Sequence, residues 1–438
     1  MEKIKLSSGI TLIYERVPGD ITSFTIGFEA GANAEGEENL GIAHATEHMV
    51  FKGTKNRSEK EINDLCNEYL GFHNAMTNFP YVVYYGSCLK EDFKQGFNVY
   101  FDIVFNPIFK EEGFKEEMSV ILEELKEWSD DVVQHCEDML FFNAFEERRI
   151  KNLIIGKEET IKALTIKDIK EFYEAYYTLE KCVISVVTAL DKTEVIKIIE
   201  EEISRSQGDK RNKATQIQGD NKRKFEHTLK KEENTIEELS NERLKNQLPL
   251  YENPKAGIFK EENPTINGCK VQYIFPIHEL SEKEIAIMQM FNEYFASGTS
   301  SILYDEIRTK RGLVYDIQGK VKSEKGIKLY TITLSTSKEN LQTVQEIIQN
   351  KIDEIKVSEE IFNEEFFKKF SKSQKRKRML ALEKSIVMSM YLAVYEIMHS
   401  GAELLLNEFS GVEGVDKDTL KLLLDKVFCC GAVGIINN

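Results

Sequence analysis

The spacing of hydrophobic and polar residues changes several times along the first half of the chain. Short alternating runs around Ser7-Ser8-Gly9 predict a β-hairpin over Lys3–Tyr14, and a further alternating run predicts a strand at Ser23–Phe28. Further strands and helices follow from the same patterns: a helix at Glu59–Gly71, strands within Phe72–Leu89, helices through Glu91–Glu146, a helix at Thr165–Tyr177 and a strand at Cys182–Thr188.

The second half repeats this mixture in outline. Strands are predicted near Gly257 and at Cys269–Phe275, followed by a helix at Ser281–Tyr294. Gly53-Thr54, a helix and Gly71 are paralleled by Gly298-Thr299, a helix and Gly312, and each half ends on an apolar strand that follows a helix. Because neither half alternates strand and helix regularly, the sequence predicts an α+β fold: two similar domains, each an antiparallel-rich sheet covered by helices.

The length of 438 residues is also more than one ordinary core accommodates. We expect a first domain over residues 1–203 and a second over residues 256–438. Residues 204–255 are mostly Lys, Glu, Asn, Gln and Asp, which predicts a charged linker carrying some helix.

Composition and charge limit the kinds of molecule that this protein is expected to bind and the compartment in which it is expected to occur. The net charge of −16 argues against nucleic acid, and we expect no concentrated basic face. No apolar run is long enough to span a membrane, and the N-terminus begins directly with strand-like sequence. Seven cysteines, an odd number without a CxxC motif, suit a reducing compartment, so we expect a cytoplasmic protein.

The candidate chemistry lies in the stretch from Gly41 to Thr54. His44 and His48 are one helical turn apart, so both imidazoles can reach a single ion while Glu47 stands beside them. Catalytic zinc takes three protein ligands and leaves a fourth position for water, so the pair predicts a further ligand elsewhere. Without that ligand the pattern also occurs by chance in unrelated chains.

A second helix, predicted over Gly113–Trp128, offers carboxylates for this role. Its apolar stripe consists of Met118, Ile121, Leu122, Leu125 and Trp128. On a helical wheel Glu117 and Glu124 lie at the border of this stripe. Glu116, Glu123 and Glu127 lie on the opposite face, where a solvated surface is the ordinary role of such residues.

These motifs resemble those of the pitrilysin and insulinase metallopeptidases, whose zinc motif has the same inverted order. The resemblance implies that the third ligand is Glu124, 76 residues after His48, and that Glu117, seven residues earlier, supports the site. Gly41, Ala43 and the run Phe51-Lys-Gly-Thr54 match the family's flanks. The resemblance also implies that Glu47 is the general acid and base of peptide hydrolysis on one Zn²⁺ per chain.

Further contacts follow from the same resemblance. Gly71–Thr77 is similar to the family's approach to an Asn-Ala pair, which makes Asn74 and the backbone of Ala75 peptide contacts. Leu-Val-Tyr315 follows Arg308 in a motif that in the family holds substrate at the zinc, so Arg308 and Tyr315 are expected to stabilise the oxyanion. Arg311 is the main competitor for the arginine role.

The resemblance further implies a clamshell whose chamber admits peptides and unfolded segments, and a homodimer, since the zinc motif and the Arg/Tyr pair occur in one chain. The expected function is therefore that of a zinc-dependent endopeptidase. Two alternatives remain open. One is a processing peptidase that removes a leader from a dedicated precursor, and the other is a non-catalytic structural subunit of a larger complex.

Overall fold

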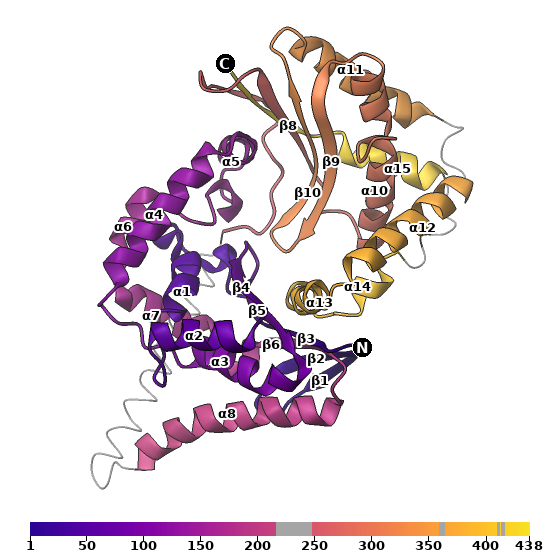
Figure 1. Cartoon of the computed structure of the whole chain (residues 1–438). Coiled ribbons are helices and arrows are strands. Elements are labelled where there is room, and N and C mark those ends of the chain that lie inside the picture. The colour runs from indigo at the N-terminus through magenta and orange to yellow at the C-terminus, as the bar shows by residue number, and fades with distance from the viewer. Residues whose placement is uncertain (216–247, 359–363, 410–411, 413–416) are drawn as a thin grey trace. The chain divides into compact units, whose positions relative to one another are not determined.

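The computed structural model describes residues 1–215, 248–358, 364–409, 412 and 417–438 (Figure 1). It contains two compact units, and neither is a consecutive stretch of chain. The first unit consists of Met1–Leu122, Ile154–Leu248 and Leu382–Leu405, and the second of Glu123–Leu153, Pro249–Ala381 and Leu406–Asn438. Each unit combines one sheet with helices, which confirms the predicted α+β fold class.

The first unit is built on a six-stranded sheet. Its strands are β1 (Glu2–Lys5), β2 (Thr11–Arg16), β3 (Ile21–Phe28), β4 (Phe72–Thr77), β5 (Val82–Leu89) and β6 (Val183–Thr188). They lie in the order β1-β2-β6-β3-β5-β4, with every neighbouring pair antiparallel except β2 and β6. The predicted hairpin is confirmed, and β4 forms an edge of the sheet.

Alternation along β3 shows how both faces of this sheet are covered. Phe24 packs its ring against the aromatic side chains of helix α3 (Phe93–Phe105) on one face. On the other face lies helix α13 (Ser385–His399), where Thr25 is hydrogen-bonded to Ser389 (3.0 Å). Gly27 lies under the same helix, and a Cβ there would come within 2.7 Å of the Ile397 side chain. The helices of the unit are α1 (Ile42–Val50), α2 (Glu59–Tyr69), α3 (Phe93–Phe105), α6 (Glu158–Ala163), α7 (Ile166–Tyr176), α8 (Lys192–Thr215) and α13 (Ser385–His399).

The second unit contains a five-stranded sheet. Its strands are β7 (Gly257–Glu262), β8 (Cys269–Pro276), β9 (Val314–Glu324), β10 (Ile327–Thr336) and β11 (Ala432–Asn437), in the order β7-β11-β8-β10-β9. Only β7 and β11 run parallel among these neighbours. The helices of this unit are α5 (Val132–Ala144), α10 (Glu282–Phe295), a π-helix (Tyr304–Thr309), α11 (Leu341–Val357), α12 (Glu364–Ala381) and α15 (Lys417–Val427). Two further helices, α4 (Phe114–Asp130) and α14 (Leu404–Asn407), each begin among residues of the first unit and end among residues of the second.

The two sheets share one topology, as the internal repeat predicts. Strands β2, β6, β3, β5 and β4 of the first sheet occupy the same places as β7, β11, β8, β10 and β9 of the second. The last strand of the first sheet, β6, runs parallel to β2 and antiparallel to β3. The last strand of the second sheet, β11, likewise runs parallel to β7 and antiparallel to β8. The second sheet also has helical chain, α10 and the π-helix, where α1 and α2 stand in the first.

The compact units differ from the consecutive domain ranges predicted from the sequence because each half of the chain contributes a helix to the other unit. Helix α13, from the second half, packs on β3 and β6, whereas α5, from the first half, packs on β8 and β11. Of the predicted linker, residues 204–215 belong to α8 and residues 216–247 lie outside the described residues. Among the described helices, none has the length and apolar character needed to cross a membrane.

Candidate metal centre

Helix α1, which carries His44, Glu47 and His48, begins at a tightly packed point of the first unit. Gly41 adopts a φ of 93°, and a Cβ at this position would lie 2.4 Å from the carbonyl oxygen of Ile155. The buried carboxylate of Glu35 accepts hydrogen bonds from the backbone N–H groups of Gly41 (3.0 Å) and Ala43 (2.9 Å). A negative group at a helix N-terminus satisfies its unbonded donors and complements its dipole, so Glu35 fixes the start of α1.

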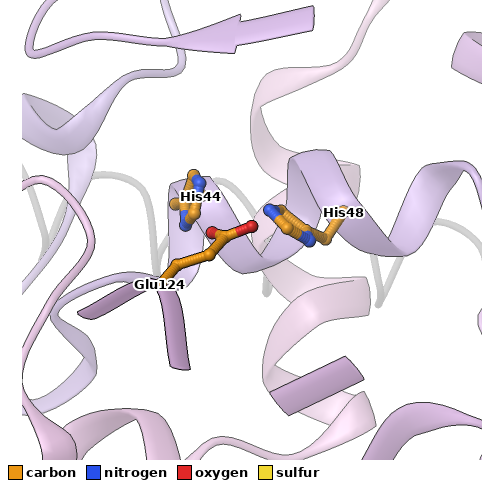
Figure 2. Close-up of side chains that lie close together, drawn as sticks. All are labelled: His44, His48 and Glu124. Atoms are coloured by element: carbon orange, nitrogen blue, oxygen red, sulfur yellow. The ribbon is translucent and has the colours of Figure 1, made fainter. Parts of the chain in front are cut away.

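His44, His48 and Glu124 come together as a group that could hold a metal ion (Figure 2). One ligand atom from each lies within 4.8 Å of the others, and all three side chains are half-buried. Two imidazole nitrogens and one carboxylate are a donor set of catalytic zinc sites with three protein ligands. The residues present therefore fit zinc.

The carboxylates of α4 divide as the helical wheel predicts. Glu117 is buried and Glu124 half-buried, whereas Glu116, Glu123 and Glu127 are exposed. Helix α4 is continuous from Phe114 to Asp130, and Glu117 and Glu124 are two turns apart on one side of it. Helical periodicity thus places both carboxylates towards α1.

Glu117 holds His48 in one orientation. Its Oε1 lies 2.8 Å from His48 Nδ1, and its Oε2 lies 2.5 Å from Lys52 Nζ. Burial opposes ionisation of Glu117, but the hydrogen bonds from His48 and Lys52 outweigh it and lower the pKa of this carboxyl. Because an ionised carboxylate only accepts, Nδ1 of His48 carries the proton and Nε2 is left as the ligand atom.

His44 stands beside His48 with ring centroids 4.6 Å apart. Burial, together with the charge of His48, lowers the pKa of His44 to about 3. Its imidazole is therefore neutral at physiological pH, and the neutral form is the one that binds metals.

Glu47 is held from the neighbouring edge strand. Thr77, the last residue of β4, donates a hydrogen bond of 2.6 Å from its Oγ1 to Glu47 Oε2. Both residues are half-buried, so the carboxylate remains within reach of solvent. The Thr77 hydroxyl thus fixes the position of one carboxylate oxygen of Glu47.

Asn74 and Ala75 lie on the same edge strand. Asn74 is exposed, and its Oδ1 accepts a hydrogen bond of 2.9 Å from the N–H of Ala75. Among the described strands, β4 pairs only with β5, so its outer edge offers backbone groups. His73 is not part of the metal-binding group, and its Nδ1 lies 3.1 Å from the Tyr100 hydroxyl.

Arg308 and Tyr315 belong to the second unit and contact each other there. The Nε of Arg308, in the π-helix, donates to the backbone oxygen of Tyr315 (2.9 Å), and its guanidinium lies 5.3 Å from the Tyr304 ring centroid. Tyr315, near the start of β9, is 72% exposed. Arg311, the alternative cation, is ion-paired with Glu306 instead. Arg308 and Tyr315 are thus two exposed residues joined through the backbone oxygen of Tyr315.

Three supporting residues were not singled out from the sequence. Lys52 lies in the run Phe51-Lys-Gly-Thr54 and Thr77 ends the Asn-Ala stretch, so their places in these motifs were the available signals. Glu35 had no such signal because it acts across a loop on backbone groups.

Comparison with known proteins places these observations in a family. Residues 11–158 match the model of the insulinase family (peptidase family M16), and residues 163–366 match the peptidase M16 inactive domain. An "uncharacterized zinc protease" of Rickettsia felis is 25% identical over 386 residues, which are 87% of this chain and 84% of that protein. A probable mitochondrial-processing peptidase subunit beta of Schizosaccharomyces pombe is 32% identical over 204 residues, which are 45% of this chain and 44% of that protein.

The fold has solved counterparts. The crystal structure of a protease from Helicobacter pylori superposes with a TM-score of 0.81 at 17% identity and covers 100% of this chain and 99% of that one. The two matched models together take in most of the chain, and they agree with the duplicated topology and with the inverted His-x-x-Glu-His motif. The chain belongs to the insulinase family of peptidases, family M16.

Proposed function

We propose that this protein is a zinc-dependent endopeptidase that hydrolyses peptides and unfolded polypeptide segments. The observation that carries the proposal is the meeting of His44, His48 and Glu124 within 4.8 Å, with Glu47 beside the two histidines on α1. In this proposal the three side chains would hold Zn²⁺, which would supply a Lewis acid for activating water and polarising the scissile carbonyl.

The protein's own residues divide the remaining work. Glu47 removes a proton from the attacking water and delivers one to the leaving amine, and Thr77 keeps its carboxylate in place. Glu117 orients His48 through Nδ1. Arg308 and Tyr315 offer a guanidinium and a phenol to the negative charge that develops on the carbonyl oxygen.

The edge strand β4 is the proposed peptide-binding element. An extended substrate adding to this edge would bond to backbone groups near Asn74 and Ala75, and Thr77 at the end of the strand leads directly to Glu47. Recognition through the backbone tolerates many side chains but requires an unfolded segment. A chamber enclosing such segments, a homodimer and a cytoplasmic location complete the proposal.

A dedicated processing peptidase is the second candidate function. The observation in its favour is the 30–32% identity to mitochondrial-processing peptidase beta subunits of fungi and Dictyostelium discoideum, over less than half of each chain. A structural subunit is less well supported, because the candidate ligands and Glu47 are all present.

The test compares the purified chain with its Glu47→Gln variant on a set of unstructured peptides and one folded protein. We expect chelator-sensitive cleavage of several peptides, restored by zinc, and no cleavage of the folded protein. The variant should bind the same amount of zinc and lose turnover. Retained turnover in Glu47→Gln would refute the role of Glu47, and cleavage of a single precursor sequence would favour the processing enzyme.

A further inference from the structure

Helix α12 has two unlike faces. Its inner face packs on the second unit through Phe366, Phe367 and Phe370, and the rings of Phe366 and Phe370 lie 5.2 and 5.8 Å from Tyr294 of α10. Gln374, on the same side, donates a hydrogen bond to the backbone oxygen of Gln289. The inner face therefore fixes the rotation of the helix about its axis.

The outer face carries a row of exposed cations, here called the α12 cationic face. Its members are Lys368, Lys369, Lys372, Lys375 and Arg376. At about 100° per residue they fall within an arc of about 120°, on the side of the helix opposite to the phenylalanines. No ion pair joins any of the five to another described residue, whereas the two remaining cations of the helix, Lys377 and Arg378, are paired with Glu293 and Glu408. The sequence-based expectation that no concentrated basic face occurs is therefore wrong.

The charge of this helix is opposite to that of the chain. Helix α12 contains seven Lys and Arg residues and two Glu residues, a net charge of +5, while the whole chain carries −16. The rest of the chain thus carries −21. A large polyanion or an anionic membrane extends beyond the helix and is repelled by this net negative charge. A short acidic segment meets mainly the local field, because salt screens charges over about 8–10 Å.

The spacing of the cations suits an extended polypeptide. Lys368, Lys372 and Arg376 follow one another at intervals of about 6 Å along the helix axis, and Lys375 lies about 4.5 Å beyond Lys372. Side chains on one side of an extended strand repeat every 6.6–6.8 Å, roughly the same interval. Met379 and Leu380, which are 65% and 63% exposed, follow one turn later on the same face and offer an apolar contact beyond the last cation.

We propose that the α12 cationic face binds acidic, extended polypeptide segments in which carboxylates alternate with other residues and an apolar residue follows. The second half of this family member would then select, by charge, which unfolded chains it retains. That the bound segment is also a substrate rests on the proposed peptidase function, whereas binding itself requires no hydrolysis.

Binding is measured by fluorescence anisotropy with the full-length Glu47→Gln chain, so that the peptide stays intact. The probe is a labelled peptide alternating Glu and Ser and ending in Leu-Leu, and its matched control has Gln in place of Glu. We expect the acidic peptide to bind about tenfold more tightly at about 50 mM salt, and this preference to fall steeply by about 300 mM.

Two triple variants separate local from global charge. Lys368→Gln with Lys372→Gln and Lys375→Gln should weaken binding of the acidic peptide about tenfold and leave the Gln peptide unchanged. The control triple, Lys283→Gln with Lys320→Gln and Lys421→Gln, removes the same charge from exposed lysines of the same unit and should change binding less than about twofold.

The outcome decides among occupants. Equal binding of the two peptides, or equal loss in both triple variants, would overturn the proposal. The proposal would also be overturned if the triple variant of the α12 lysines lost binding only to single-stranded DNA or phosphatidylserine vesicles, tested in the same assay, and bound the acidic peptide as before. Because this readout is independent of hydrolysis, an inactive chain that still binds the acidic peptide would refute the peptidase function alone.

Discussion

The hydrogen bond from Thr77 to Glu47 makes a specific prediction about catalysis. Replacing Thr77 by Val keeps the branched shape of the side chain and removes the donor that holds Glu47 Oε2 at 2.6 Å. The residue is half-buried at the end of an edge strand, so we expect the fold to persist. The Thr77→Val variant should therefore keep its fold and lose only the hydrogen bond that positions Glu47.

The size of the effect follows from the contact. A hydrogen bond to a charged group contributes about 1.5–3 kcal/mol. Because Thr77 and Glu47 are only half-buried, water can replace part of the interaction, so the lower value applies. A loss of about 1.4 kcal/mol in transition-state stabilisation corresponds to about a tenfold decrease in kcat/KM.

The assay measures kcat and KM for one unstructured peptide, together with zinc content. We expect the decrease to fall in kcat at unchanged zinc content, since Thr77 is hydrogen-bonded to Glu47 and is not one of the candidate ligands. Thr77→Ser keeps the hydroxyl and should restore most of the rate. A Thr77→Val variant with unchanged kcat, or a Ser variant as slow as the Val variant, would refute the positioning role.

Three further predictions concern the stability of the fold. Glu35→Gln should lower the thermal midpoint by several degrees in a melting experiment, because it removes a charged acceptor worth about 1–2 kcal/mol at the start of α1; an unchanged midpoint would contradict this. Burial raises the pKa of Asp138 from 3.8 to about 6, so the stability it contributes is present below about pH 4 and is lost as pH rises through about 6. In urea unfolding, the free energy of unfolding of Asp138→Asn relative to that of the wild type should therefore rise by on the order of 1 kcal/mol between about pH 5 and pH 8. A difference between the two proteins that does not change with pH would exclude the effect. Residues 1–203 expressed alone lack α13 and should aggregate or bind a hydrophobic dye, whereas a monodisperse fragment would show that the helix is dispensable.

Much of the site could be predicted because it depends on local periodicity. The turn between His44 and His48 and the border positions of Glu117 and Glu124 follow from 3.6 residues per turn. The wheel separated the two inward carboxylates of α4 from the three exposed ones without any knowledge of the partner helix. Which of the two would join the histidines as a metal ligand did not follow from the wheel, and came from the family spacing.

Interactions across loops and between strands could not be predicted in this way. Glu35 caps α1 through backbone groups of Gly41 and Ala43, and such contacts leave no periodic trace in the sequence. Thr77 reaches Glu47 only because β4 lies beside α1. The α12 cationic face was not predicted because the net charge of −16 is a sum over the whole chain and does not show where five neighbouring cations lie.

The exchange of helices explains why consecutive domain ranges do not describe the packing. Thr25 and Ser185 of the first sheet are hydrogen-bonded to Ser389, more than 200 residues later in the chain. In the second unit, Gly434 of β11 lies against α5, where a Cβ would come within 2.9 Å of Leu140 Cβ. Both helices have amphipathic or apolar sequences that predict burial, but periodicity does not say which sheet they cover. A duplicated fold offers two equivalent sheets, so the choice between them is made by close contacts of this kind, each between residues far apart in the sequence.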